Sequence, residues 1–420
     1  MYATKTSVEQ LNQLYKELEW EMNENILPFW MKQVEDHENG GFFGRITNDG
    51  IAVKDAPKGA VLNARILWTF SAAYNLTGRT EYLEYSQRAY TYFINYFIDS
   101  KYGGVVWSIT ANGEILNHRK QIYAQAFAIY AFAEYYLATG EQESILLASD
   151  LYGFIEKHAF DTQCNGYIEA RSREWEPLED LRLSEKDANE PKSMNTHLHI
   201  LEAYTKLFEV WKDDELGKRL YNLIKIHTDK ILSAKNGHFN LFFDMDWNPK
   251  SEQYSFGHDI EGAWLITEAA RVLGIKVVAE QAEHLAVIMA GITLQEGIAE
   301  DGSLYNEGLK GQVIDTDRHW WPQAEVIIGF INAWEISKNP KFLIAAQNTW
   351  YFVKSRMRHS SGEWWWLVNE KYEPDHSQDL AGEWKCPYHN SRCSIEAMKR
   401  ISKHFACNYP ELLKSLSGKN

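Results

Sequence analysis

The sequence has few cysteines, and none of them stands in a recognised motif. The four residues Cys164, Cys386, Cys393 and Cys407 form no Cys-x-x-Cys pair, so the common zinc-finger and dithiol redox motifs are excluded. We expect them to be reduced, buried thiols of a reducing compartment. Ten prolines among 420 residues are also few, and most fall between the helices expected below.

Several targeting and cofactor signals are missing as well. The first residues, MYATKTSVEQL, lack the apolar core of a signal peptide, and no run of 18 apolar residues occurs. We therefore expect a cytoplasmic protein that does not span a membrane. Neither GxxxxGK[ST] nor GxGxxG occurs, so phosphate-binding and dinucleotide-binding loops have no support. We expect no cofactor.

Positive charge is scarce. The chain has 43 Lys and Arg against 58 Asp and Glu, a formal net charge of −15. This argues against a nucleic acid partner and against an acidic polymer as substrate. A neutral ligand is expected, and we expect a monomer or a weak dimer.

Aromatic residues, by contrast, are abundant. They make up 14% of the chain and include 16 Trp. Most of these rings are expected to fill a large helical core. A few are expected to form flat platforms in a cleft.

Six short glycine-plus-aromatic segments, here called the glycine marks, recur along the whole chain. They read NGGFFG (39–44), YGGVVW (102–107), NGYIE (165–169), NGHFNLFF (236–243), DGSLY (301–305) and SGEWWW (361–366). Successive glycines from Gly41 to Gly362 are 63, 62, 71, 65 and 60 residues apart. A period of this regularity is typical of a repeat architecture, and no composition break interrupts it. We therefore expect one domain over residues 1–420.

Between the marks lie stretches with apolar residues at helical spacing. Twelve are expected, at 7–28, 62–76, 82–98, 121–138, 143–157, 195–211, 215–232, 258–273, 277–292, 321–336, 340–357 and 391–406. Twelve helices in six hairpins predict an all-α (α/α)6 barrel, closed by the first helix against the last. The aromatic runs after the glycines predict short β-hairpins in the loops at one mouth. An open α-solenoid is the alternative, but its loops are usually short and alike.

The expected inner helices begin with unusual polar and aromatic residues. They are Arg65, Tyr123, Asn195, His199, His258, Glu261, Trp321 and Glu325, with His389 just before the last helix. Asn195 and His199, and likewise Trp321 and Glu325, are four apart and share a helix face. His197 lies two residues from His199 and must point elsewhere. Groups at the same stage of each repeat are expected to face one cavity.

Several imidazoles around one cavity, with an arginine, favour proton abstraction next to a carbonyl. Imidazole titrates near neutrality and can both remove and return a proton. Arg65 would stabilise the oxyanion of the enediolate. A glycosidase needs a carboxylate pair, and Asp187, Glu190, Glu261 and Glu325 are candidates, so hydrolysis stays open. A three-histidine zinc site has no HExxH motif behind it, and we expect no metal. A non-catalytic sugar-binding module would not need the histidines.

Five stretches resemble the N-acylglucosamine 2-epimerase superfamily, and within it the cellobiose 2-epimerase branch. They read NARILW (63–68), EPKSMNTHLHILEAYT (190–205), FGHDIEGAWL (256–265), DRHWWPQAE (317–325) and EWKCPYHNSR (383–392), and they span almost the whole chain. The fold of that superfamily is an (α/α)6 barrel. Its members epimerise C2 of a reducing sugar without a redox cofactor.

The resemblance also implies roles for individual residues. His258 and His389 would be the acid/base pair that removes the C2 proton and returns one to the opposite face of a cis-enediolate. His199 would polarise the O1/O2 region, Arg65 would bind the enediolate, and Tyr123 would lie beside it. Asn195, Asp187, Glu261, Trp321 and Trp384 would contact the sugar. The implied substrates are neutral β-1,4-linked disaccharides with a reducing glucose or mannose, such as cellobiose, lactose or mannobiose. Aldose–ketose isomerisation of a monosaccharide is the nearest alternative, followed by epimerisation of N-acylglucosamine and, more distantly, (α/α)6 glycoside hydrolysis.

Overall fold

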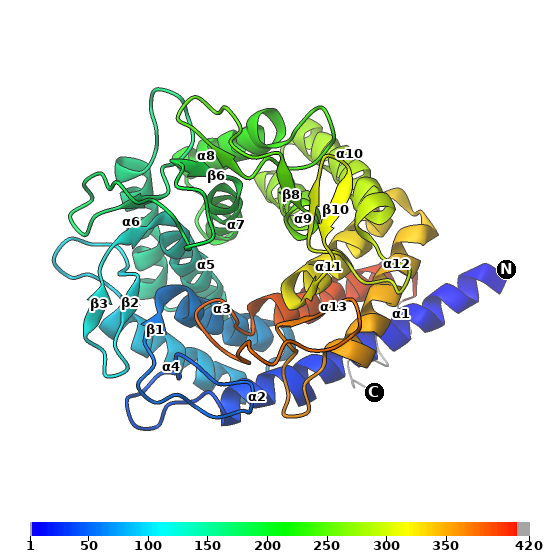
Figure 1. Ribbon diagram of the computed structural model, residues 1–420, viewed down its shortest axis with the longest axis horizontal. Coiled ribbons are helices and arrows are strands. Elements are labelled where there is room, and N and C mark those ends of the chain that lie inside the picture. Colours follow the sequence, from blue (N-terminus) through cyan, green and yellow to red (C-terminus); the bar gives the residue numbers. More distant parts are fainter. Residues whose placement is uncertain (1, 410–420) are drawn as a thin grey trace.

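The computed structural model describes residues 2–409, and its helices form a closed ring (Figure 1). Six inner helices surround the centre: α3 (Ala60–Thr77), α5 (Ile122–Thr139), α7 (Met194–Val210), α9 (Phe256–Leu273), α11 (Trp320–Ser337) and α13 (Tyr388–Asn408). Five outer helices follow the inner ones: α4 (Thr80–Tyr96), α6 (Gln142–His158), α8 (Asp214–Ile226), α10 (Lys276–Ile292) and α12 (Pro340–Phe352). The sixth outer helix is the N-terminal one, which packs against α13 and closes the ring. The predicted (α/α)6 barrel is confirmed.

The N-terminal helix is longer than the sequence pattern suggested. The expected segment 7–28 is part of α1 (Tyr2–Trp20), a π-helical segment η1 (Glu21–Ile26) and α2 (Leu27–Lys32). Three outer helices end in similar π-helical segments, η2 (His227–Ile231), η3 (Thr293–Gly297) and η4 (Val353–Met357). Nine of the other eleven helices begin and end within three residues of the prediction, whereas α8 and α12 end six and five residues early, where η2 and η4 continue them.

Inner and outer helices differ in how they are buried. Almost every residue in the first four turns of α5 is buried, from Ile122 to Tyr135, because this helix packs against neighbours on all sides. The outer helix α8 buries only one stripe, with Leu216, Leu220 and Leu223 in it. This is the pattern of a two-layered barrel, in which only the outer layer meets solvent.

Each glycine mark is a tight turn that follows an outer helix. One antiparallel bridge closes each turn: Glu35–Phe42, Ile98–Val105, Phe160–Tyr167, Leu232–Phe239, Ile298–Leu304 and Arg358–Trp364. All six glycines have positive φ, which favours glycine. At Gly41 a Cβ would also lie 2.6 Å from the Tyr92 ring. The repeat seen in the sequence is thus a repeated backbone turn.

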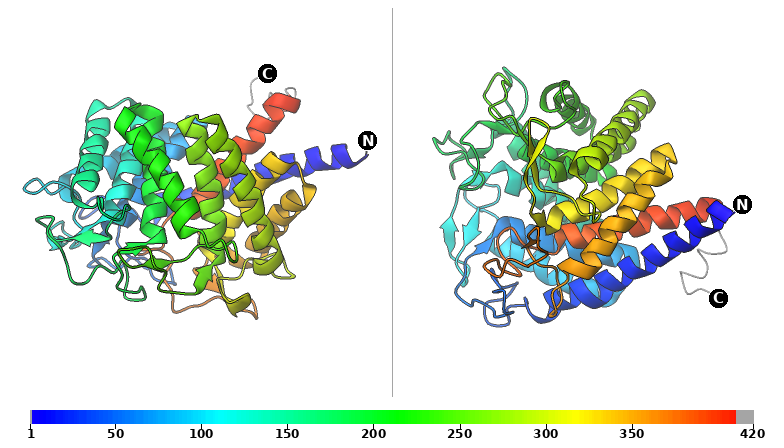
Figure 2. Two further views of the ribbon diagram at one scale, coloured as in Figure 1. Left: turned by 90° about the horizontal axis from the view of Figure 1, so that it is seen from above. Right: turned by 45° about the vertical axis from the view of Figure 1, so that its right-hand side comes forward.

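The short strands lie with the loops at one mouth of the barrel (Figure 2), and their pairings run from repeat to repeat as a strand ring. Most link neighbouring repeats: β1 (Lys58–Gly59) pairs with β2 (Ser108–Ile109), β4 (Lys120–Gln121) with β5 (Ala170–Arg171), β6 (Lys192–Ser193) with β7 (Phe242–Phe243), β8 (Gln253–Ser255) with β9 (Glu307–Leu309), and β11 (Arg318–His319) with β12 (Leu367–Val368). The bridge between Ile46 and Ala381 joins the first repeat to the last. Local hairpins form only with β3 (Ile115–Asn117) and β10 (Gln312–Asp315) among the described strands.

Buried ion pairs fix the segment that leads into each of several inner helices. Lys58 Nζ lies 2.8 Å from Asp36 Oδ2 in the preceding glycine turn, and both side chains are buried. The same arrangement recurs as Lys120–Asp99, Lys192–Asp161 and Lys385–Glu363. Because the lysine lies within three residues of the helix start, each pair sets where that helix begins relative to the mouth.

Two further expectations concern the surface. Cys386 and Cys393 are buried, but Cys164 is partly exposed and Cys407 is exposed, so the expectation of four buried thiols was wrong for these two; all four are unpaired. One stretch, Lys276–Gly297, is apolar and long enough to cross a membrane by length and composition alone. It comprises α10 and η3 of the outer layer, where Ala282, Ala286 and Met289 are buried in the barrel wall.

Candidate active site

The predicted site residues occupy equivalent positions on the inner helices. Tyr123, Asn195, Trp321 and His389 are the second residues of α5, α7, α11 and α13, and His258 is the third residue of α9. Arg65, His199, Glu261 and Glu325 are the sixth residues of α3, α7, α9 and α11. All therefore lie in the first two turns, at the mouth that carries the strands.

One of these positions differs from the sequence prediction. His389 was expected just before the last helix, but it lies in the first turn of α13, which begins at Tyr388. Pro387 is the residue that precedes the helix, where its missing N–H costs nothing.

A cleft of about 390 Å³ opens at this mouth. Asp187, Asn195, His258 and Trp321 line it, together with Glu307 of β9 and His319 of β11. Asp187 accepts hydrogen bonds from the backbone N–H and hydroxyl of Ser184, which hold its carboxylate in the loop above α7.

Arg65, Tyr123 and His199 form one wall of the site. Nη2 of Arg65 donates to the Tyr123 hydroxyl at 2.7 Å, and the guanidinium lies 4.2 Å from the centre of the Phe127 ring. The rings of Tyr123 and His199 are 4.9 Å apart, and Trp384 lies 6.0 Å from Tyr123. This wall therefore combines a buried cation, a hydroxyl and an imidazole.

His258 and His389 both lie beside the indole of Trp321. The Trp321 ring centre lies 4.6 Å from that of His258 and 5.6 Å from that of His389. Nδ1 of His389 is 2.7 Å from Oε1 of Glu325. No described residue bonds either Nε2, so these nitrogens are left for a substrate.

Burial keeps both of these histidines neutral. Burial, and secondarily the neighbouring His199, lowers the pKa of His258 to about 3. Burial also holds the pKa of His389 well below its usual value, and the nearby Arg65 and Arg392 act in the same direction. A neutral imidazole can accept a proton, which is what a base needs.

Four buried polar atoms in this cluster have no hydrogen-bonding partner among the described residues. They are Nε of Arg65, Oδ1 of Asn195, Nδ1 of His258 and Oε2 of Glu261. Native proteins rarely leave such atoms unpaired. A ligand rich in hydroxyl groups would satisfy them.

The sequence reasoning missed two residues, Glu202 and Arg392. Glu202 Oε2 lies 2.9 Å from Nδ1 of His199, and Arg392 contacts Glu202, Glu261 and Glu325. Both carried a signal, because Glu202 is three residues after His199 and Arg392 is three after His389, a spacing that shares a helix face. Arg392 and His199 outweigh burial and lower the pKa of Glu202 to about 2. Burial and Glu325 raise that of Glu261 to about 7.

Ligand atoms of Glu261, Glu325 and His389 lie within 4.8 Å of one another, close enough to hold a metal ion. Nη2 of Arg392 contacts Oε1 of both carboxylates. The guanidinium thus stands between the two oxygens and already supplies their positive charge. This donor set does not favour a metal.

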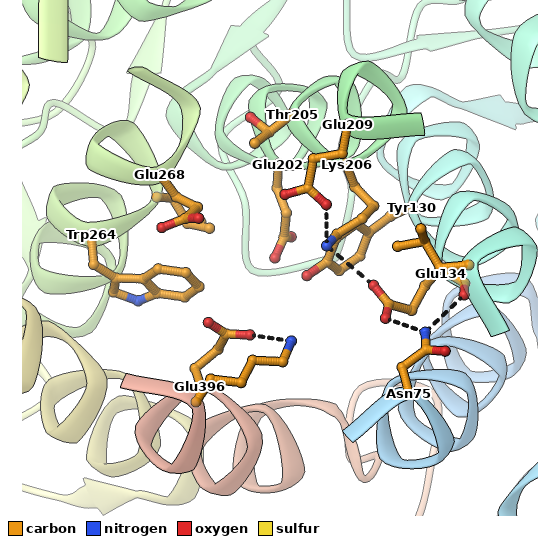
Figure 3. A pocket seen from close by; sticks show the side chains of 13 residues that line it. Asn75, Tyr130, Glu134, Glu202, Thr205, Lys206, Glu209, Trp264, Glu268 and Glu396 are labelled. Carbon is orange, nitrogen blue, oxygen red and sulfur yellow. Dashed lines mark hydrogen bonds and ion pairs between the residues drawn. The ribbon is translucent and has the colours of Figure 1, made fainter. Parts of the chain in front are cut away.

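A second cavity, of about 480 Å³, lies toward the C-terminal ends of the inner helices (Figure 3). Its charged groups are paired within the wall: Lys206 with Glu134 and Glu209, and Lys399 with Glu396. Glu202 borders this cavity and also bonds His199 of the active site. Glu202 thus lies between the second cavity and the histidines of the active site.

The sequence model of the N-acylglucosamine 2-epimerase family matches residues 41–393. This match covers all of the site residues described above. The chain belongs to the N-acylglucosamine 2-epimerase family.

Within this family the similar proteins include several cellobiose 2-epimerases. That of Bacteroides fragilis is 48% identical over 92% of this chain and 98% of its own. That of Dictyoglomus turgidum is 38% identical over 93% of this chain and 100% of its own. The solved structure of cellobiose 2-epimerase from Bacillus thermoamylovorans superposes with a TM-score of 0.89 at 39% identity, covering 93% of this chain and 100% of that one. Family and fold thus agree with an epimerase, an isomerase-class enzyme.

Proposed function

We propose that the protein is a cofactor-independent 2-epimerase of β-1,4-linked disaccharides with a reducing glucose or mannose, such as cellobiose, lactose and mannobiose. The observation that carries the proposal is the placement of His258 and His389 beside Trp321, in a cluster that also holds the buried Arg65. Relatives named cellobiose 2-epimerase, similar along nearly their whole length, support the choice of substrate. We further propose that the enzyme works in the cytoplasm without metal, as a monomer or weak dimer, and binds neither nucleic acid nor membrane.

The chemistry follows from the acidity of the proton next to the aldehyde in an opened sugar. One of the two neutral histidines takes the C2 proton, and the electrons move onto O1 to give a planar cis-enediolate. Arg65 and Tyr123 stabilise this charge, since a buried guanidinium is most effective where solvent cannot screen it. After rotation about C2–C3, the other histidine takes up a proton from solvent on Nε2 and donates it to C2 from the opposite face. The first histidine releases its proton to solvent, which completes the inversion and restores both neutral imidazoles.

The aromatic rings are suited to hold the sugars. Trp321 borders the cleft, and Trp384 lies 6.0 Å from Trp107 and from Tyr123. The net charge of −15 suits a neutral ligand better than an anionic one. Asp187 and Asn195 offer acceptors for hydroxyl groups at the same mouth.

The test is product analysis by NMR. The purified protein is incubated with cellobiose, lactose, mannobiose or N-acetylglucosamine, without added cofactor and with EDTA. We expect the 2-epimer of each disaccharide. A ketose as the main product would make the enzyme an aldose–ketose isomerase, free monosaccharides would make it a hydrolase, and turnover of N-acetylglucosamine alone would make it an N-acylglucosamine 2-epimerase.

A further inference from the structure

One buried guanidinium joins three inner helices behind the catalytic histidines. Arg392 of α13 is completely buried. Its Nη1 donates to Oε1 of Glu202 on α7, and its Nη2 donates to Oε1 of Glu261 on α9 and, at 2.7 Å, to Oε1 of Glu325 on α11. Nη1 also lies against the Tyr388 hydroxyl, which itself donates to Glu202.

Two of these carboxylates directly contact histidines of the site. Oε2 of Glu202 lies 2.9 Å from Nδ1 of His199, and Oε1 of Glu325 lies 2.7 Å from Nδ1 of His389. The third, Glu261, is three residues after His258 on the same helix. The guanidinium is therefore linked to His199 and to His389 through one intervening carboxylate each.

The charge of Arg392, placed against all three carboxylates at once, decides what these contacts do. An ionised carboxylate only accepts hydrogen bonds, so it requires a proton on Nδ1 of the histidine and leaves the Nε2 lone pair free. Without a cation, three buried carboxylates this close would repel one another and take up protons instead. A neutral carboxyl group can donate to Nδ1 and select the opposite tautomer.

We propose that Arg392 is a positioning residue of the epimerisation: through Glu202 and Glu325 it holds His199 and His389 in the tautomer that presents Nε2 to the sugar. The proposal rests on the proposed function for its kinetic effect, but the tautomer of the two histidines is independent of any substrate. Arginine is needed because its planar fork reaches all three carboxylates at once, which a lysine ammonium cannot do.

Arg400 provides a matched control on the same helix. It is also buried and bonded to carboxylates, those of Glu335 and Glu268, but it has no contact with the histidines. The variants R392K and R400K each replace one buried guanidinium group with an ammonium group, so the positive charge is kept. Both are expected to melt at a lower temperature than the unaltered protein.

The kinetic test separates position from stability. In R392K we expect kcat to fall by about 10²-fold or more, the scale of losses when a catalytic histidine is left in the wrong tautomer, with KM changed by less than about threefold. R400K should keep both constants. A folded R392K with kcat within about twofold of R400K would overturn the proposal.

The second test needs neither activity nor an altered Arg392, in case R392K does not fold. The Glu325→Gln variant replaces the carboxylate with an amide of nearly the same shape, which changes the hydrogen bonding far more than the packing. In ¹⁵N-histidine NMR spectra of the substrate-free protein, we expect the unaltered His389 with its proton on Nδ1, and a changed Nδ1 resonance in E325Q. A proton on Nε2 of His389 in the unaltered protein would overturn the proposal even if the disaccharide is epimerised. The expected tautomer in a protein that epimerises nothing would instead count against the proposed function alone.

Discussion

Nδ1 of His389 lies 2.7 Å from Oε1 of Glu325, although 64 residues separate the two in sequence. The contact exists because α13 and α11 are neighbours in the ring and both residues lie near the same ends of their helices. It fixes one nitrogen of the ring and leaves the other for the sugar. The predictions below follow from this arrangement and from the packing that maintains it.

Replacing either acid/base histidine should reduce turnover more than binding. His258→Asn and His389→Asn should each lower kcat by about 10²-fold or more, because each removes one of the two proton carriers. KM should change little, since other groups hold the sugar. Steady-state kinetics on cellobiose measure both constants.

The control for these variants is His37→Asn, whose side chain is 77% exposed and does not line the cleft. It should leave kcat unchanged. Full activity in His389→Asn would show that this imidazole moves no proton.

Gly257 should be intolerant of a methyl group. A Cβ there would lie 2.6 Å from Cη2 of Trp321 and 3.0 Å from Cβ of Pro322, so the indole beside His258 must shift. A displacement of this kind at a reacting group costs about 10²-fold in rate. We expect Gly257→Ala to lower kcat/KM by about that factor.

Gly153 is the matched control, since a Cβ there meets no atom within 4 Å on the outer helix α6. Gly153→Ala should keep full activity and stabilise the fold by about 0.5–1 kcal/mol. Equal activity in the two variants would mean that the position of Trp321 does not matter for the reaction.

The buried Lys58–Asp36 pair should be essential for stability. Both side chains are nearly inaccessible, so Lys58→Met leaves an uncompensated buried carboxylate. We expect the free energy of unfolding to fall by about 3–5 kcal/mol.

The nearby exposed pair Lys54–Glu38 gives the comparison, because both of its side chains are more than 60% exposed. Lys54→Met should cost about 0–1 kcal/mol in chemical denaturation. Similar losses in both variants would show that burial of the pair is irrelevant.

Acid should destabilise the barrel partly through His227. Burial lowers its pKa to about 4, and its Nε2 is buried without a partner among the described residues. Above pH 6.5 both folded and unfolded states are neutral at this residue, so it contributes nothing to the pH dependence. As the pH falls from 6.5 toward 4, the unfolded state binds the proton first and stability is lost.

The variant His227→Leu should therefore lose less stability between pH 6.5 and pH 4. The difference in slope corresponds to about one proton, which the unaltered protein takes up on unfolding and the variant does not. Urea denaturation at several pH values measures this slope, with the exposed His37→Gln as control. An unchanged slope in His227→Leu would show that His227 is protonated in the folded state.

Much of the fold was predictable because its signals are local. The glycine turns need positive φ and an aromatic neighbour, and the amphipathic stretches between them are long. The strand ring was less accessible to sequence reasoning, because strands such as Lys58–Gly59 have two residues and no periodicity. Their partners lie about 50 residues away in the next repeat.

The candidate site was likewise predictable only where its signals are local. The histidines and Arg65 could be located because they interrupt apolar inner helices at equivalent positions. The contacts of Arg392 with Glu202, Glu261 and Glu325 depend on ring closure and on side-chain rotamers across four helices. The position of His389 inside α13 depended on where that helix begins. The helical pattern placed its start at residue 391, three residues after the observed start that follows Pro387.

The central claim is that two histidines exchange the C2 proton of the sugar with solvent. The most direct test is turnover of cellobiose in D2O, followed by NMR and mass spectrometry of the isolated epimer. The account predicts one deuterium at C2 of the product and none at other carbons, without added nicotinamide cofactor. A product that forms in D2O and keeps the original hydrogen at C2 would contradict it.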